Sequence, residues 1–408
     1  MSLSSLARSE RANAALGWTF TGVTAAVGIA AVVAGSLAWA GLWFLLSVVV
    51  AAPAVGTGDW KALVPWPLPA MAAAAAVVQS VGLYPELAGY VAVAGLALVV
   101  VVELDVFSSV EMSRRFTVVF AAMTTMAVQA WWTVVQFVSD WWFGTRFLRS
   151  QTELQWDIVA VTAVAVVAGG FFVWYFDRID HAGGRGYAAE SGGVLVTLSE
   201  TLGLGQRWER RLVRLLQAGL AGLVLYGLAT FRLGMAASGA LALSVTLLPA
   251  ALRREYGYTM DAGLVLWITL AIVLHVAGSL GVYAEFSWYD EITHTVSATV
   301  VAGAGYAALR AVERHSSAVE VPPPVRSAFV VVFVLSFGVV WEVFEFGAVE
   351  LSRALGFDSP VTVYGIDDIV TDFVFNTVGA VLVALWGTDS VGGFVAFLGR
   401  RLGSNAGE

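Results

Sequence analysis

The sequence has no cysteine, and lysine and charged residues in general are scarce. Without cysteine the chain has no disulfides, no thiolate metal site and no cysteine nucleophile. Cysteine usage therefore gives no information on whether the protein resides in an oxidising or a reducing compartment. Lys61 is the one lysine, and arginine otherwise supplies the positive charge against 30 aspartates and glutamates. This bias is typical of GC-rich and halophilic genomes, such as those of halophilic archaea. The chain also lacks a nucleotide-binding loop, a serine-centred elbow and a basic face, so neither those chemistries nor nucleic-acid binding is indicated.

Apolar sequence is what the chain has in excess. Of its 408 residues, 59% are hydrophobic and 13% are charged, and the mean hydropathy is +0.79. These values lie outside the soluble globular range and predict an all-α, polytopic membrane helical bundle. The first apolar stretch, about 16–55, is longer than the roughly 7 to 15 residues of a signal-peptide core, so we expect two retained helices there.

Apolar windows of about 17 to 25 residues predict twelve membrane-spanning helices. With both termini in the cytoplasm, 18 of the 22 lysines and arginines fall on the cytoplasmic side, which is the positive-inside pattern. We therefore expect a multi-pass protein of the cell membrane with cytoplasmic N- and C-termini. The approximate spans are 16–35, 37–56, 66–83, 88–104, 115–140, 156–176, 212–230, 234–252, 261–283, 291–310, 326–350 and 368–387.

Three short segments of the first half recur in the second half, in the same order. They predict two parallel six-helix repeats, 1–176 and 212–408, joined by a polar cytoplasmic linker, 177–211. Most acidic groups of the second copy are missing from the first, so we expect the second copy to hold the functional site and the first to be degenerate. The pairs are Ser80–Leu87 with Ser279–Phe286, Trp132–Phe137 with Trp341–Phe346, and Trp156–Val159 with Asp367–Val370.

Acidic and imidazole side chains interrupt the last apolar segments. A charge in the middle of a membrane helix costs roughly 2.5 to 3.5 kcal/mol, so such groups indicate function. Spacings of three or four residues place each set on one helix face, and the predicted topology places the faces together in the outer half of the membrane. We expect one acidic pocket open to the exterior. Its groups are Asp290 and His294, Glu342 and Glu345, and Asp368, Asp372 and Asn376, with His275 one helix earlier.

Two chemistries fit such a pocket, because clustered carboxylates cannot all stay ionised without a compensating proton, cation or arginine. A divalent cation such as Mg²⁺ or Mn²⁺ would organise a phosphate or diphosphate, here a lipid head group. A proton relay explains the same residues. The expected metal ligands are Asp290, His294, Glu345, Asp368 and Asp372. The expected catalytic or relay groups are Glu342, Glu345 and Asp372, and the expected substrate contacts are Asn376 and His275.

Ordinary structural roles remain open for part of this set. Charges at helix ends fit solvated or capping positions, and these are Glu285, Asp290, Glu291, Asp358 and Asp367. Seven tryptophans predict an aromatic belt at the outer interface. These are Trp131, Trp132, Trp141, Trp142, Trp156, Trp288 and Trp341.

The order and spacing of these residues resemble VanZ-like membrane proteins. The pattern is Asp290-x3-His294, Glu342-x2-Glu345 and Asp372-x3-Asn376-x2-Gly379, with Glu345 where VanZ-like proteins have Gln. The form Trp-Glu-x2-Glu-Phe is similar to the related YjdF-like inner-membrane proteins. The resemblance covers about 235–387 and implies a small helical membrane module whose polar cluster is the functional centre.

Three kinds of function follow from the sequence. The first is a membrane module that binds or acts on a lipid, isoprenoid or envelope-linked substrate with a divalent cation. The second is a proton-coupled secondary transporter, because twelve spans in two parallel halves also describe the major facilitator architecture. The third is a membrane scaffold that binds a partner without turnover. Whether the protein is an enzyme stays open at this point.

Overall fold

The computed structural model describes residues 9–176, 206–257, 259–316, 319–359, 361 and 364–386. In these residues all regular structure is helical, apart from an isolated bridge between Glu111 and Glu320. The chain divides into two compact units. Unit 1 comprises Met1–Gly184 with Ala318–Pro322, and unit 2 comprises Arg185–Ser317 with Pro323–Glu408.

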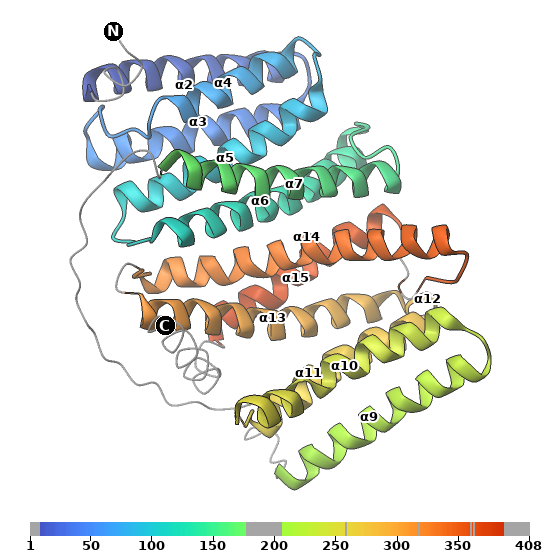
Figure 1. Cartoon of the computed structure of the whole chain (residues 1–408). Helices are drawn as coiled ribbons and strands as arrows, with labels where there is room; N and C mark the ends of the chain where they lie inside the picture. Colours follow the sequence, from blue (N-terminus) through green and yellow to red (C-terminus); the bar gives the residue numbers. More distant parts are fainter. Residues whose placement is uncertain are drawn as a thin grey trace. The chain divides into compact units, whose positions relative to one another are not determined.

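Unit 1 is a bundle of helices that follow one another along the chain (Figure 1). Serine side chains start two of them: Ser9 accepts from the Ala12 N–H, and Ser113 accepts from the Phe116 N–H. Gly58 and Gly144 end two of them in the left-handed conformation. The helices are α2 (Glu10–Val33), α3 (Leu37–Thr57), α4 (Pro67–Ser80), α5 (Pro85–Phe107), α6 (Arg114–Phe143) and α7 (Gln151–Phe176).

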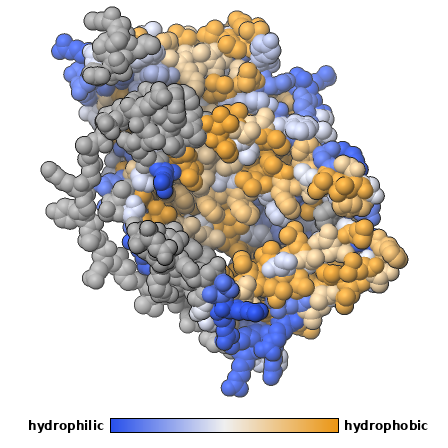
Figure 2. Space-filling view, viewed as in Figure 1, coloured by the Kyte–Doolittle hydropathy of each residue, from blue (hydrophilic) through white to orange (hydrophobic). Residues whose placement is uncertain are grey.

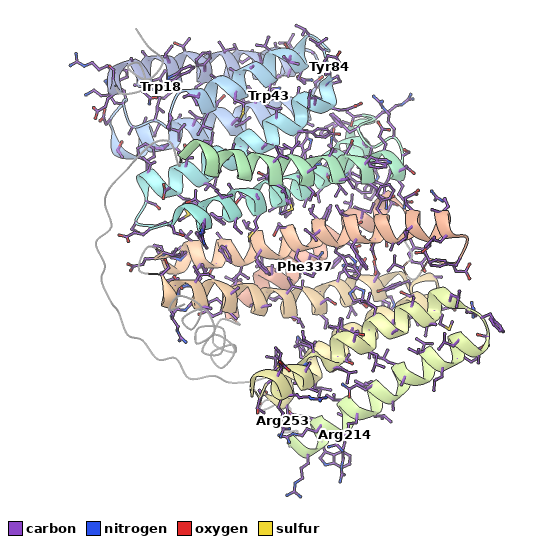
Figure 3. The ribbon with its side chains drawn as sticks, in the orientation of Figure 1. Trp18, Trp43, Tyr84, Arg214, Arg253 and Phe337 are labelled. Carbon is purple, nitrogen blue, oxygen red and sulfur yellow. The ribbon has the colours of Figure 1, made fainter. Side chains whose placement is uncertain are left out.

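The core of unit 1 combines large and very small side chains. Trp43, labelled in Figure 3, is fully buried and packs with Leu46 against alanines of α4 and α5 such as Ala76 and Ala92. Alanine at these positions lets neighbouring helices approach closely, which is how membrane helices associate where lipid is as apolar as the core. The packing therefore follows from the alanine-rich sequence of α4 and α5.

Unit 2 contains the last helices of the chain. Arg214 and Arg253, labelled in Figure 3, lie at the same end of the antiparallel pair α9 and α10. In the second part of the unit, α13 packs against both α14 and α15. The elements are α9 (Gln206–Ala229), α10 (Leu233–Tyr256), α11 (Ala262–Ala277), the π-helix η1 (Gly278–Val282), α12 (Tyr283–Glu285), α13 (Ser287–His315), α14 (Pro323–Leu355) and α15 (Ile366–Trp386).

Every predicted span coincides with a helix, but fewer helices qualify as spans than predicted. Within the described residues, 10 helices are long and apolar enough to cross a membrane. The span predicted at 66–83 is α4, which has only 14 residues. Such a helix is about 21 Å long, against a hydrocarbon thickness of about 30 Å. The span predicted at 156–176 coincides with α7, whose side chains beyond Val167 lie outside the described part.

The surface of the helices has the character of a membrane protein. Figure 2 shows hydrophobic residues spread over the visible helix flanks and hydrophilic residues near helix ends. Large exposed side chains such as Val33, Trp141 and Phe231 are apolar. A surface of this kind is stable in lipid, so the chain is a multi-pass membrane protein in a bilayer environment. The predicted orientation of the termini and the predicted division at 177–211 stay predictions, and α9 begins at Gln206, inside the predicted linker.

The predicted aromatic belt is only partly right. Trp131, Trp141, Trp142, Trp156 and Trp288 are exposed. Trp132, however, is 8% exposed and packs against Trp39, with ring centroids 5.3 Å apart. Trp341 contacts His275 in unit 2, with ring centroids 6.1 Å apart. Both tryptophans lie inside their helices, Trp132 within α6 and Trp341 within α14, and it is packing against rings from other helices that separates them from the belt.

Candidate metal centre

The site in unit 2 depends on a close approach between α13 and α15. A Cβ atom added to Gly379 would lie 2.5 Å from the Thr295 carbonyl oxygen and 2.6 Å from the Ala298 Cβ. Only glycine fits a contact of this kind between two helix backbones. Because Asp372 and Asn376 precede Gly379 on α15, the same approach brings them against the polar face of α13.

Three side chains meet where these helices touch. The Nε2 atom of His294 lies 3.1 Å from Asp372 Oδ1 and 3.6 Å from Asp290 Oδ1. One ligand atom of each residue lies within 4.8 Å of the other two. His294 is 7% exposed and Asp372 is 4% exposed, while Asp290 is half-buried. The structure therefore contains a buried Asp/His/Asp group, made of residues that the sequence had singled out.

Asp368 extends this group toward the start of α15. Its side chain forms a hydrogen-bonding contact with the Asp290 carboxyl. Its Oδ2 atom accepts from the Tyr364 backbone N–H at 2.9 Å. Two carboxyl groups make such a contact only when a proton or a cation lies between them, since ionised carboxylates have acceptors and no donor.

Glu342 and Glu345 on α14 face the same region. Glu342 is 2% exposed, and its Oε2 atom has no hydrogen-bond partner among the described residues. It interacts electrostatically with Glu345 and with Asp372. Glu345 accepts a hydrogen bond from the indole of Trp341. These two glutamates are not part of the three-residue group of mutually close ligand atoms, and neither is Asp368.

His275 lies on the other side of His294. The two imidazole rings meet edge to face, with centroids 5.1 Å apart and an interplanar angle of 83°. One ring nitrogen of His275 lies 2.9 Å from the Ser297 hydroxyl and the other lies 3.0 Å from the Tyr283 hydroxyl. Sequence reasoning missed Ser297 and Tyr283 as members of the site. The signal for Ser297 was its spacing of three residues from His294 on one helix face.

Tyr283 reaches His275 because the helix is interrupted between them. Residues of η1 follow α11 directly, and Gly281 has a φ of 122°, which lies in the region that favours glycine. The Tyr283 ring folds back onto Gly278, where any added Cβ would collide with it. A regular helix would have pointed Tyr283 elsewhere, so the interruption positions this side chain.

Asn376 is the hydrogen-bond partner of His294 within α15. On its other side a Cβ added to Gly338 of α14 would lie 3.0 Å from the Asn376 Nδ2 atom. Asn376 is thus held between α13 and α14, and its amide fixes the orientation of the His294 ring. Such partners of a ligand histidine tune metal sites.

Arginine does not neutralise the cluster in the described part of the chain. Arg353 is the arginine nearest in sequence to Glu342 and Glu345 of the cluster. It pairs with Glu350 on the exposed face of α14. Arg310 and Arg326 both pair with Glu313. Protons or a cation must therefore compensate the carboxylates around His294.

Two segments of the chain match protein families. Residues 211–391 match the family described as "Predicted membrane protein (DUF2238)". Residues 1–63 match a "Domain of unknown function (DUF8268)". The first match covers α11 to α15, and so it covers every residue of the cluster. No curated protein and no solved structure matches the chain. The resemblance to VanZ-like and YjdF-like proteins, and the internal repeat, stay predictions.

Proposed function

We propose that unit 2 binds a divalent cation at Asp290, His294 and Asp372 and uses it to bind or act on a phosphate-bearing lipid or envelope-linked substrate. The observation that supports the cation is the mutual closeness of the three ligand atoms. Ligands at about 2.1 Å from one ion lie about 3 to 4 Å apart. The distances of 3.1 Å and 3.6 Å from His294 Nε2 to the two carboxylates fall in this interval.

The donor set narrows the choice of ion. Carboxylate oxygens suit Mg²⁺ and Mn²⁺, and the imidazole makes Mn²⁺ the better fit of the two. Asp368 completes the site through its contact with Asp290. The ion would supply positive charge for a phosphate or diphosphate in a region without an arginine partner in the described residues.

The surrounding groups have roles of their own in this proposal. Glu342 and Glu345 are the acid–base or relay pair, because they face Asp372 and lie outside the three-ligand group. Asn376 orients His294, and His275 with Tyr283 offers a polar wall to a substrate. The charge pattern of the sequence predicts that this region lies in the outer half of the membrane, where lipid head groups are within reach.

The test measures bound metal in purified full-length protein by mass spectrometry, together with thermal shifts on adding Mg²⁺, Mn²⁺ or Zn²⁺. We expect the unmodified protein to retain one ion and the variants Asp372→Asn and His294→Gln to lose it. Asp367→Asn is the matched control, since Asp367 is an exposed carboxylate at the start of the same helix. Absence of metal together with absence of any thermal shift contradicts the proposal.

A proton relay is the second candidate, favoured by the unpartnered Oε2 atom of Glu342 and by the contact between the Asp290 and Asp368 carboxyls. It predicts proton movement in proteoliposomes that persists after chelation of divalent ions and disappears in Glu342→Gln. Proton movement that stops when divalent ions are chelated would indicate that the cluster binds a cation and does not relay protons by itself.

A further inference from the structure

Unit 1 contains a cavity of about 260 Å³, in the half of the chain that the sequence predicted to be degenerate. It lies at the end of the bundle where α6 ends and where α5 and α7 begin. The volume approaches that of small-ligand sites, roughly 300 Å³ and above. The cavity is lined by groups of both charge signs, and the positions of these groups indicate the chemical class of ligand that would bind there.

The charged side chains in the cavity lining include two arginines, Arg146 and Arg149, and two glutamates, Glu86 and Glu153. Asp140 anchors the loop between α6 and α7, because its carboxylate accepts from the backbone N–H groups of Phe147 at 2.8 Å and Leu148 at 2.9 Å. This loop holds Arg146 and Arg149 at the cavity. Arg149 lies 3.5 Å from Glu153. Arg146 has no carboxylate partner among the described residues, so its guanidinium is available to an anion.

The inner wall instead offers hydrogen-bond acceptors. Gln129 is 3% exposed and lines the cavity, and its Oε1 atom has no partner in the described part of the chain. Asp157 also lines the cavity, and one of its oxygens accepts from the Tyr90 hydroxyl. A buried acceptor without a donor is unfavourable, so these groups fit a ligand that brings N–H groups.

Aromatic rings complete the lining. Trp39 and Trp132 lie 5.3 Å apart, and Phe147 meets their rings edge-on at 6.1 Å and 6.4 Å. Aromatic faces of this kind attract ammonium groups, tryptophan most strongly. The hydrogen-bond acceptors and the aromatic faces of the lining therefore both favour a ligand that carries an ammonium group.

We propose that this cavity binds a small zwitterion bearing an ammonium group and a phosphate, as in an aminoalkyl phosphate. The phosphate meets Arg146 at the mouth, and the ammonium meets Gln129, Asp157 and the tryptophan faces. A purely anionic ligand would leave Gln129 without a donor, and a purely cationic one would leave Arg146 without an anion. The same chemistry occurs in a free phosphoethanolamine and in the head group of an aminophospholipid.

Calorimetric titration of the full-length protein in phosphatidylglycerol nanodiscs tests the ligand class. Phosphoethanolamine should bind at least about tenfold more tightly than ethanolamine or inorganic phosphate, since each of those satisfies only half of the lining. A parallel measurement uses nanodiscs with labelled phosphatidylethanolamine. Binding of the free compound supports a soluble ligand, and binding of the lipid alone supports a head group. The proposal is overturned if neither binds, or if one half-ligand binds as tightly as the zwitterion.

Two variants test the assigned contacts. Arg146→Gln should weaken phosphoethanolamine binding about tenfold and leave ethanolamine binding unchanged. Gln129→Met should weaken both ligands without lowering the melting temperature of the unliganded protein, because it removes an unpartnered buried acceptor. Arg115→Gln is the control, since Arg115 lies at the opposite end of α6. Unchanged affinities in both test variants would also overturn the proposal.

Discussion

The Nε2 atom of His294 on α13 lies 3.1 Å from the Oδ1 atom of Asp372 on α15. This contact joins two helices that α14 separates in the chain. It also joins two residues that the sequence selected on different grounds, namely the Asp290-His294 pair and the acidic start of the last helix.

The close approach of α13 and α15 predicts that Gly379 is required for stability. Gly379→Ala should destabilise unit 2 by about 1 to 3 kcal/mol, because the new methyl group would press on the Thr295 backbone. Thermal unfolding in detergent measures the loss. Gly347→Ala is the matched control, since nothing lies within 4 Å of a Cβ there, and it should be neutral or slightly stabilising. Equal effects of the two substitutions would contradict the helix contact.

Asn376 should tune the cation site without being a ligand. Asn376→Leu removes the partner of the His294 imidazole, and it should weaken cation affinity by about 10- to 100-fold. Titration of the purified protein with Mn²⁺ measures the change. Thr377→Val is the control, because the Thr377 hydroxyl donates to the Phe373 carbonyl within α15. An affinity that stays the same in Asn376→Leu would mean that the amide does not position the ring.

Glu342 should be needed for function and not for stability. Its carboxyl is buried and has an oxygen without a partner in the described residues, so Glu342→Gln should leave the melting temperature unchanged or raise it. The same change should abolish substrate turnover or proton flux. A variant that unfolds, or one that stays fully active, would assign Glu342 to packing. Alanine at Glu342, Glu345 and Asp372 without any cellular effect would favour the scaffold function.

Cation affinity should fall as the pH is lowered. Protons compete with the ion for the imidazole of His294 and for the carboxylates of Asp290 and Asp372, so binding releases protons. Titrations at several pH values, in buffers with different ionisation enthalpies, measure both the affinity and the proton release. Asp367→Asn should show the same dependence as the unmodified protein. A cation affinity independent of pH would exclude these three residues as ligands.

Apolar length and charge spacing predicted much of this structure. The helices coincide with the predicted spans because length and hydropathy are local properties of the sequence. The polar faces of α13 and α15 were predictable because a spacing of four residues fixes a helix face. Asp290, His294 and Asp372 meet as expected, whereas Glu345 and Asp368, also expected as ligands, lie outside the three-residue group.

Features that depend on long-range packing were not predictable. Tyr283 joins the site only because η1 interrupts the helix after α11, and nothing in the hydropathy pattern marks this interruption. Trp132 was expected in the aromatic belt, but it is buried because Trp39 of α3 packs against it. The cavity of unit 1 depends on the loop that Asp140 holds. Gly82 and Gly281, which the repeat would pair, both have positive φ, and the repeat itself stays a prediction.

In the proposed site, His294 and its two aspartates bind one cation. Pulsed electron paramagnetic resonance of the Mn²⁺-loaded protein can detect this coordination, because a directly bound imidazole nitrogen modulates the electron spin echo. We expect nitrogen modulation in the unmodified protein and in Asp367→Asn, and its loss in His294→Gln. Bound Mn²⁺ without nitrogen modulation, or modulation that survives in His294→Gln, would show that His294 is not a ligand of the ion.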